Sequence, residues 1–99
     1  MMQHQQIEAQ QQLMNQFNNN FKKINVIFKS STRKIITIRA KYGTTVKELL
    51  DEYMKRAFGF PKENIEFLYD ASKIDRNELT TVEKFFRFGL AFVWVNETK

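Results

Sequence analysis

The stretch Lys34–Met54, KIITIRAKYGTTVKELLDEYM, changes its hydrophobic period within a few residues. Before Gly43, the apolar residues occupy every second position. This period of two is typical of a half-buried strand. After Gly43, apolar side chains recur every three or four residues, which is typical of one face of an α-helix. The two apolar series are Ile36, Ile38 and Ala40, and then Val46, Leu49, Leu50, Tyr53, Met54 and Ala57. The sequence therefore predicts a strand that leads directly into an amphipathic helix.

The flanking segments predict a hairpin before this stretch and a defined helix end after it. Residues 24–29 also alternate, and the short polar segment 30–33 joins them to the next strand as in a β-hairpin. Thr44 or Thr45 can cap the helix, and Glu48 lies at the capping-box spacing from Thr45. We expect the helix to stop at Gly59-Phe60-Pro61, because glycine and proline end helices.

The second half of the chain predicts two further strands and a short helical turn. Residues 65–69, IEFLY, are rich in aromatic and branched side chains, as strands are. A turn at 70–73 precedes Ile74, and residues 79–84 are expected to form one helical turn. The charge-free run 90–95, LAFVWV, is typical of a central strand that is buried on both faces. This order indicates an α+β fold with one main helix.

Length and composition limit the chain to one small domain and a tail. Its 99 residues, 42% of them apolar, can build a single core. Residues 1–20 are rich in Gln and Asn, so we expect a flexible tail there and a folded domain over residues 21–99. No apolar run approaches the roughly 18 residues of a membrane span, and neither a secretory signal nor a cysteine is present. We expect an intracellular protein, cytoplasmic or nuclear, that does not contact membranes.

Positive charge is concentrated in the first half of the chain. The net charge is +5, and no acidic residue occurs from Ala9 to Lys47. The basic residues of that span are Lys22, Lys23, Lys29, Arg33, Lys34, Arg39, Lys41 and Lys47. This asymmetry favours an acidic partner, whether a peptide, a nucleic acid or an anionic lipid. The alternative is a solvated basic face that only aids solubility.

Several motifs resemble ubiquitin over about residues 24–95. The hairpin FKSSTRKIITI, residues 28–38, is similar to the first hairpin of ubiquitin in length and in its Lys-x-x-x-x-Lys-x-Ile-Thr-Leu pattern. Thr45-Val46 opens the helix as the family's Thr-Ile does, and Gly59-Phe60-Pro61 resembles the Gly-Ile-Pro after it. Phe67-Leu68-Tyr69-Asp70 resembles the strand Leu-Ile-Phe-Ala, and Leu79 starts a Leu-Ser-Asp-like turn. The resemblance implies a ubiquitin-like β-grasp (ββαββ), in which a mixed sheet packs on one main helix.

The end of the chain departs from the conjugated members of that family. Ubiquitin and its conjugated relatives finish in a flexible tail ending Gly-Gly, whose carboxylate is activated. This chain ends Val95-Asn96-Glu97-Thr98-Lys99. We therefore expect the chain as given not to be conjugated. The alternative is a ubiquitin-like modifier that is processed from a longer precursor and conjugated after maturation.

The resemblance also implies a binding patch on the sheet for ubiquitin-like receptor proteins. Leu68 corresponds to the central isoleucine of the family's patch, and Val93 corresponds to its valine. Ala91 replaces the histidine, and Ser31 replaces the leucine of the hairpin loop. The resemblance therefore implies a modified patch that keeps two apolar members.

A second site is implied at the edge of the predicted sheet. The strand over residues 35–41 is an edge in this fold, and SUMO-like relatives accept there an extended apolar peptide flanked by acids. The residues of this predicted site are Ile35, Thr37, Arg39, Lys41, Lys47 and Leu50. Backbone pairing would supply affinity, and the basic side chains would select acidic flanks. The alternative is that these charges only protect the edge from aggregation.

The sequence favours a non-catalytic protein-binding role over other classes of function. The chain has no cysteine, and its one histidine, His4, has no companion ligand, so we expect no catalysis, no metal and no cofactor. The basic span supports nucleic-acid binding as an alternative. Against it, most Phe and Tyr residues occupy predicted core positions, which leaves no stacking set among the basic residues. We expect a monomer that binds acidic-apolar protein segments through its sheet face and its basic edge strand.

Overall fold

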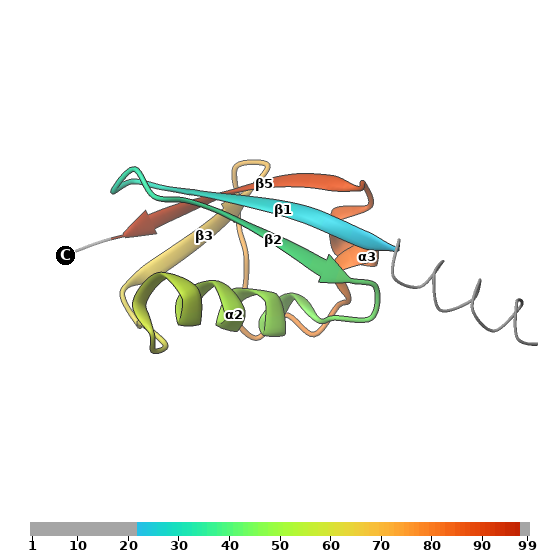
Figure 1. Ribbon diagram of the computed structural model, residues 1–99, viewed down its shortest axis with the longest axis horizontal. Helices are drawn as coiled ribbons and strands as arrows, with labels where there is room; N and C mark the ends of the chain where they lie inside the picture. Colours follow the sequence, from blue (N-terminus) through green and yellow to red (C-terminus); the bar gives the residue numbers. More distant parts are fainter. Residues whose placement is uncertain (1–21, 98–99) are drawn as a thin grey trace, which may run out of the picture.

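A five-stranded sheet packs across one long helix in the computed structural model, which describes residues 22–97 (Figure 1). The strands are β1 (Lys23–Ser30), β2 (Ile35–Lys41), β3 (Ile65–Tyr69), β4 (Ser72–Lys73) and β5 (Leu90–Glu97), and the helices are α2 (Val46–Phe58) and α3 (Val82–Phe86). The strand order is β2-β1-β5-β3-β4. Strands β1 and β5 are parallel, and the other neighbouring pairs are antiparallel.

This arrangement confirms the predicted α+β fold, with a mixed sheet on one main helix. The flexible tail predicted for residues 1–20 lies outside the described residues, and the domain boundaries stay a prediction. Within residues 22–97, neither helix combines the length and the apolar character needed to cross a bilayer.

Helix α2 begins and ends where its sequence predicts. The Thr45 hydroxyl accepts a hydrogen bond from the Glu48 amide at 3.1 Å, and the Glu48 carboxylate accepts one from the Thr45 amide at 3.1 Å. These bonds form the predicted capping box. The Thr45 amide and hydroxyl both donate to the Glu48 carboxylate, and they hold its pKa below the ordinary value. After the helix, Gly59 has φ +82°, a left-handed conformation that costs glycine little, and its amide donates to the Lys55 carbonyl.

The core lies between α2 and the inner face of the sheet. The helix contributes Val46, Leu49, Leu50, Tyr53 and Met54, and the long strands contribute Ile24, Val26, Phe28, Ile38, Ala40, Ile65, Phe67, Ala91, Val93 and Val95. Three aromatic rings fill its centre. The Tyr53 ring stacks on Phe28 with 4.5 Å between ring centres and contacts Phe67 edge-on at 5.7 Å. One aromatic cluster therefore joins α2 to two strands of the sheet, β1 and β3.

Strand β5 differs from its prediction, because only one of its faces is buried. It is a central strand, as predicted, between β1 and β3. Its inward residues are the buried Ala91, Val93 and Val95, and its outward residues are Leu90, Phe92 and Trp94, which are 48%, 53% and 47% exposed. The long helix covers one face of the sheet, and within residues 22–97 no second layer covers the other (Figure 1). The run LAFVWV predicts a two-sided strand because both of its faces are apolar, but the helix covers only one of them.

Two short elements also differ in detail from the sequence prediction. The predicted turn at 70–73 contains β4, which pairs with the end of β3. The helical turn expected at 79–84 forms later, as α3. The carbonyls of Thr80 and Glu78 accept hydrogen bonds from the first amides of α2, at 2.9 and 2.8 Å. Residues 78–80 therefore complete the N-terminus of α2 instead of joining α3.

The turn between β3 and β4 holds two non-glycine residues in the left-handed region. Asp70 and Ala71 have φ of +55° and +65° and connect the paired residues Tyr69 and Ser72. A two-residue hairpin loop with both φ positive favours Asp-Gly, because an L side chain is strained there. Ala71→Gly is therefore expected to raise the free energy of unfolding in urea by roughly 0.5–1 kcal/mol. Ala57→Gly, the same change inside α2, should lower it by about 1 kcal/mol, and equal losses at both sites would contradict the prediction.

Candidate interaction surface

Five apolar residues form a strip on the outer face of the sheet, away from α2. This apolar strip consists of Ile27 of β1, Leu68 of β3, and Leu90, Phe92 and Trp94 of β5. The strand register places Ile27 beside Phe92, and Leu68 beside Trp94. Because side chains alternate along a strand, the three residues of β5 point to the same side. Because contiguous exposed apolar patches are characteristic of interaction sites, the apolar strip is a candidate site.

A shallow pocket of about 360 Å³ opens within the apolar strip. Phe92, Trp94 and Leu68 line it, together with the charged side chains of Lys29 and Asp70. The Lys29 ammonium lies 5.5 Å from the centre of the Phe92 ring, a cation–π contact that holds positive charge beside the apolar wall. Such a pocket suits a large apolar side chain of a partner that carries a charged neighbour.

Basic side chains surround the apolar strip. The register of the sheet places five of them on the same outer face, namely Lys23, Lys29, Arg39, Lys41 and Lys73. Among the acids near this face, the Glu66 carboxylate lies 3.6 Å from the Lys73 ammonium, and Asp70 borders the pocket. The outer face therefore has an apolar centre and a positive rim, which attracts acidic groups and disfavours basic ones.

Two residues of the predicted patch are buried instead of exposed. Val93 and Ala91 are 1% and 2% exposed and belong to the core, whereas Leu68 lies on the outer face as predicted. The correspondence with the family was one residue out of register on β5, and such a shift moves every side chain to the opposite face. Sequence reasoning therefore missed Phe92 and Trp94. The sequence did contain a signal for them. Both alternating sets of side chains in LAFVWV are apolar, but only one set can face a single helix, so the other set must be exposed.

The loop between β1 and β2 is bound to the end of β5. The Ser31 amide donates to the Val95 carbonyl at 2.9 Å, and the Ser31 hydroxyl accepts from the Glu97 amide at 3.0 Å. The Thr32 hydroxyl donates to the Glu97 carboxylate. Burial raises the pKa of Glu97, but hydrogen bonds from two hydroxyls and the charges of two lysines outweigh it, so that pKa lies below its ordinary value. Ser31, at the position of the family's loop leucine, thus fixes the loop in place.

Strand β2 is an edge of the sheet, as predicted. Its exposed side chains are those of the predicted site, Ile35, Thr37, Arg39 and Lys41. The Tyr42 amide donates to the Lys22 carbonyl at 3.0 Å, which sets the alternation so that the even-numbered residues of β2 pair with β1. The backbone groups of residues 35, 37 and 39 therefore point away from β1, where an added strand can pair with them.

The helix side of the groove beside β2 differs from its prediction. Leu50 is fully buried, and Lys47 forms an ion pair with Asp51 at 3.0 Å. Neither residue lines the groove, whose volume is about 290 Å³ and whose helix side consists of Thr44, Glu48, Leu49, Glu52 and Arg56. The reason is helical phase, because each residue turns an α-helix by about 100°. Lys47 and Leu50, which flank Glu48 and Leu49 in sequence, therefore face other directions.

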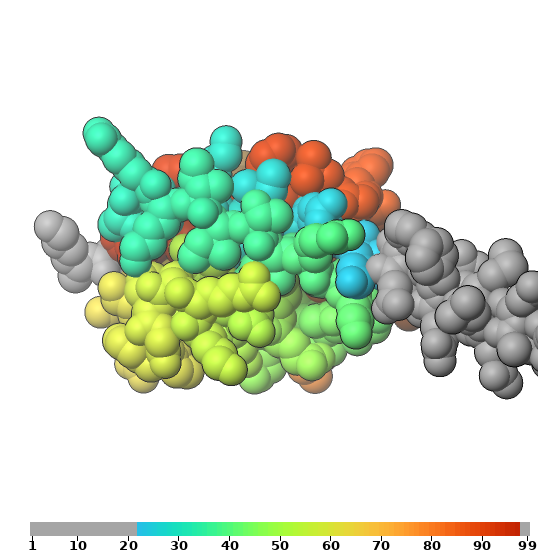
Figure 2. Space-filling model, in the orientation of Figure 1, coloured from blue at the N-terminus to red at the C-terminus, as the bar shows by residue number. Residues whose placement is uncertain are grey.

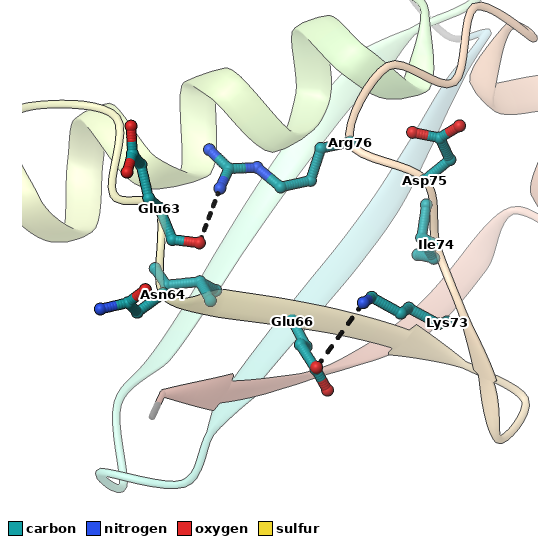
Figure 3. A pocket seen from close by; sticks show the side chains of 8 residues that line it. Glu63, Asn64, Glu66, Lys73, Ile74, Asp75 and Arg76 are labelled. Carbon is teal, nitrogen blue, oxygen red and sulfur yellow. Dashed lines mark hydrogen bonds and ion pairs between the residues drawn. The ribbon is translucent and has the colours of Figure 1, made fainter. Parts of the chain in front are cut away.

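A separate pocket of about 640 Å³ opens beside the start of β3 (Figure 3). The Arg76 guanidinium donates to the carbonyls of Lys62 and Glu63 at 2.7 and 3.3 Å. Across the pocket, Glu66 pairs with Lys73. The Arg76 hydrogen bonds tie the loop before β3 to the segment after β4, and the Glu66–Lys73 pair joins β3 to β4. The charged lining therefore has a structural role. Within residues 22–97, no three His, Cys, Asp or Glu side chains are grouped so that they could hold a metal ion.

The strand order, the mixed sheet and the one long helix within residues 22–97 define a β-grasp domain of the ubiquitin-like class. The family model Rad60-SLD, described as Ubiquitin-2 like Rad60 SUMO-like, matches residues 24–83. The chain belongs to this SUMO-like family. No curated protein matches the chain.

Solved structures of ubiquitin-like domains share this fold. The UBL domain of yeast Ddi1 is similar with a TM-score of 0.62 and 13% identity, over 75% of this chain and 87% of that one. A structure described as "Molecular Mimicry of SUMO promotes DNA repair" has a TM-score of 0.61 and 22% identity, over 75% and 90%. A designed protein based on ubiquitin has a TM-score of 0.58 and 18% identity, over 75% and 87%. At these identities the likeness shows the fold alone.

Proposed function

We propose that this chain is a non-catalytic protein-interaction domain that binds an acidic and apolar partner surface through the outer face of its sheet and its basic β2 edge. The observation that carries the proposal is the apolar strip, whose residues Phe92 and Trp94 are about half exposed on a face that the described part of the chain leaves open. Membership of a SUMO-like family supports a binding role over a chemical one. The domain acts as a monomer in the cytoplasm or nucleus.

The energetics of the outer face support a protein partner. Burying an aromatic side chain contributes about 25 cal/mol for each Å² removed from water, and tryptophan is enriched among residues that dominate interfaces. Trp94 and Phe92 lie at the centre of the face, next to a pocket that can exclude water around a partner's side chain. The basic rim would accelerate the encounter with an acidic partner and disfavour basic ones.

Trp94→Ala is expected to weaken binding of an acidic amphipathic peptide at least about tenfold, because the mutation removes a large aromatic ring from the lining of the pocket. The probe is a synthetic helical peptide with leucines along one face and glutamates at its flanks. Trp94 is the single tryptophan of the chain, so its fluorescence reports binding to the wild type directly. Anisotropy of the labelled peptide compares the variants. Phe88→Ala, an exposed aromatic outside the apolar strip, is the matched control and should leave the affinity unchanged.

Two outcomes would overturn this proposal. In the first, peptide binding is equally weak for wild type and for both variants. In the second, a single-stranded oligonucleotide changes the Trp94 fluorescence with a steep dependence on salt while the peptide does not. The second result would assign the aromatic rings and the basic rim to base stacking and phosphate contacts.

A further inference from the structure

The groove between β2 and α2 carries opposite charges on its two sides. Arg39 and Lys41 line it from the strand, and Glu48 and Glu52 line it from the helix. Figure 2 looks onto this edge of the molecule, with β2 above α2. A peptide flanked only by acids, as the resemblance to SUMO-like relatives implies, would meet two carboxylates as well as two basic groups.

The charges of this groove remain open to a ligand. Hydrogen bonds from Thr45 hold the pKa of Glu48 below its ordinary value, so its carboxylate is ionised at neutral pH. Glu52 pairs with Arg56 at 3.4 Å, but both side chains are about half exposed, and such surface pairs are weak. Within residues 22–97, no ion pair joins Arg39 or Lys41 to an acid. A ligand can therefore contact both signs of charge without breaking a strong bond.

The spacing of charges on the helix matches the spacing of side chains on an added strand. Residues four apart on an α-helix rise about 6 Å along its axis, and same-side residues of a strand are about 6.6–6.8 Å apart. Glu48, Glu52 and Arg56 follow this helical interval along the groove. If a strand paired with β2, its successive inward side chains would pass these three residues in turn. Its outward side chains would lie beside Arg39 and Lys41.

We propose that this groove binds an extended protein segment whose charges alternate in sign. Acidic side chains on the outer side of the segment pair with Arg39 and Lys41, and a basic side chain on the inner side lies against Glu48 and Glu52. The inference rests on the proposed function and names the kind of segment that the basic edge accepts. A segment with acids on both sides would place one of them against two carboxylates, and such like-charge contacts select against it.

The first experiment compares three extended peptides that differ only at three consecutive central positions, which are Glu-Lys-Glu, Glu-Glu-Glu or Gln-Gln-Gln. Each is titrated into the whole chain, and backbone amide signals report the site. The wild type is expected to bind Glu-Lys-Glu at least about tenfold more tightly than Glu-Glu-Glu, with shifts at Thr37 and Arg39. Equal or tighter binding of Glu-Glu-Glu would overturn the inference.

A charge reversal on the helix provides the second experiment. Glu52→Lys is expected to reverse the order, so that Glu-Glu-Glu binds more tightly than Glu-Lys-Glu, because the inner side of the groove becomes basic. Glu63→Lys, which adds the same charge outside the groove, is the matched control and should keep the wild-type order. An unchanged order in Glu52→Lys would also overturn the inference.

The amphipathic peptide that tests the outer face separates this inference from the proposed function. Glu52→Lys is expected to bind that peptide as the wild type does, because Glu52 lies on the opposite side of β2 from the apolar strip. Loss of the Glu-Lys-Glu preference with intact binding of the amphipathic peptide would overturn only the inference about the groove. Failure of both kinds of peptide to bind the wild type would overturn the proposed function as well.

Discussion

Phe28→Ala is expected to lower the free energy of unfolding by about 3–5 kcal/mol. Phe28 has no exposed surface, and its ring stacks on Tyr53 at 4.5 Å and meets Phe67 edge-on at 6.1 Å between ring centres. The substitution removes the ring that joins β1 to both α2 and β3. It leaves a cavity that the surrounding sheet and helix cannot fully close, so lost packing adds to lost hydrophobic transfer.

Urea denaturation followed by far-ultraviolet circular dichroism measures this loss. Phe88→Ala is the matched control, because Phe88 is 70% exposed, and it should change the free energy of unfolding by less than about 0.5 kcal/mol. If the domain has only about 5 kcal/mol of stability, Phe28→Ala will be largely unfolded without denaturant. Similar, small effects of both substitutions would show that the aromatic cluster is not the centre of the core.

Tyr53→Phe is expected to stabilise the protein, and by an amount that grows at high pH. The Tyr53 hydroxyl is buried and has no hydrogen-bond partner among the described residues. Removing it avoids the cost of an unsatisfied buried polar group, so the variant should be about 1 kcal/mol more stable at neutral pH. The ring, which makes the core contacts, is retained.

The pH dependence of this difference follows from the pKa of the hydroxyl. Burial, followed by the negative charge of Glu97, raises the pKa of Tyr53 from 10.0 to about 12. An acid with a higher pKa in the folded state holds its proton more tightly there. The wild type therefore keeps its full stability below pH 10 and loses part of it as the pH rises from 10 to 12. A shift of this size corresponds to about 2–3 kcal/mol, which the wild type loses and Tyr53→Phe does not.

Urea unfolding of both proteins from pH 8 to pH 12 measures the difference directly. All other ionisable groups are common to the two proteins, so the difference between them isolates Tyr53. Tyr42→Phe is the control, because Tyr42 is 49% exposed, and removing its hydroxyl should not reproduce the stabilisation expected for Tyr53→Phe. If the difference in the free energy of unfolding between Tyr53→Phe and the wild type did not change with pH, the raised pKa of the buried hydroxyl would be contradicted.

Local chemistry made most elements of this fold predictable from sequence. The reciprocal bonds of Thr45 and Glu48 and the left-handed Gly59 need only neighbouring residues, and both ends of α2 were predicted correctly. The alternation over residues 35–41 similarly predicted which side chains of β2 are buried and which are exposed. The late start of α3 could not be predicted from sequence. The carbonyls of Glu78 and Thr80 bind the first amides of α2, and α2 is far from these residues in the sequence.

The outer face could be predicted only in part. Leu68 was placed correctly, but Val93 and Ala91 exchanged sides with Trp94 and Phe92. The three aromatic rings of the core explain the observed choice. They fill the space under the sheet, so the inner side of β5 accepts its small residues and the large ones face outward, which keeps the interior closely packed.

By itself, the sequence determined the strands, the main helix and its caps, the positive charge of the β2 edge and the membership of the ubiquitin-like class. Only the tertiary structure decided which face of β5 meets solvent and which residues of α2 line the groove. The physical reason is geometric. A one-residue shift turns a helix by about 100° and reverses the faces of a strand, while the hydrophobic pattern that builds the fold stays almost the same. The position of α2 against the sheet therefore selected Trp94 and Phe92 for the exposed outer face, and Glu48 and Glu52 for the groove beside β2.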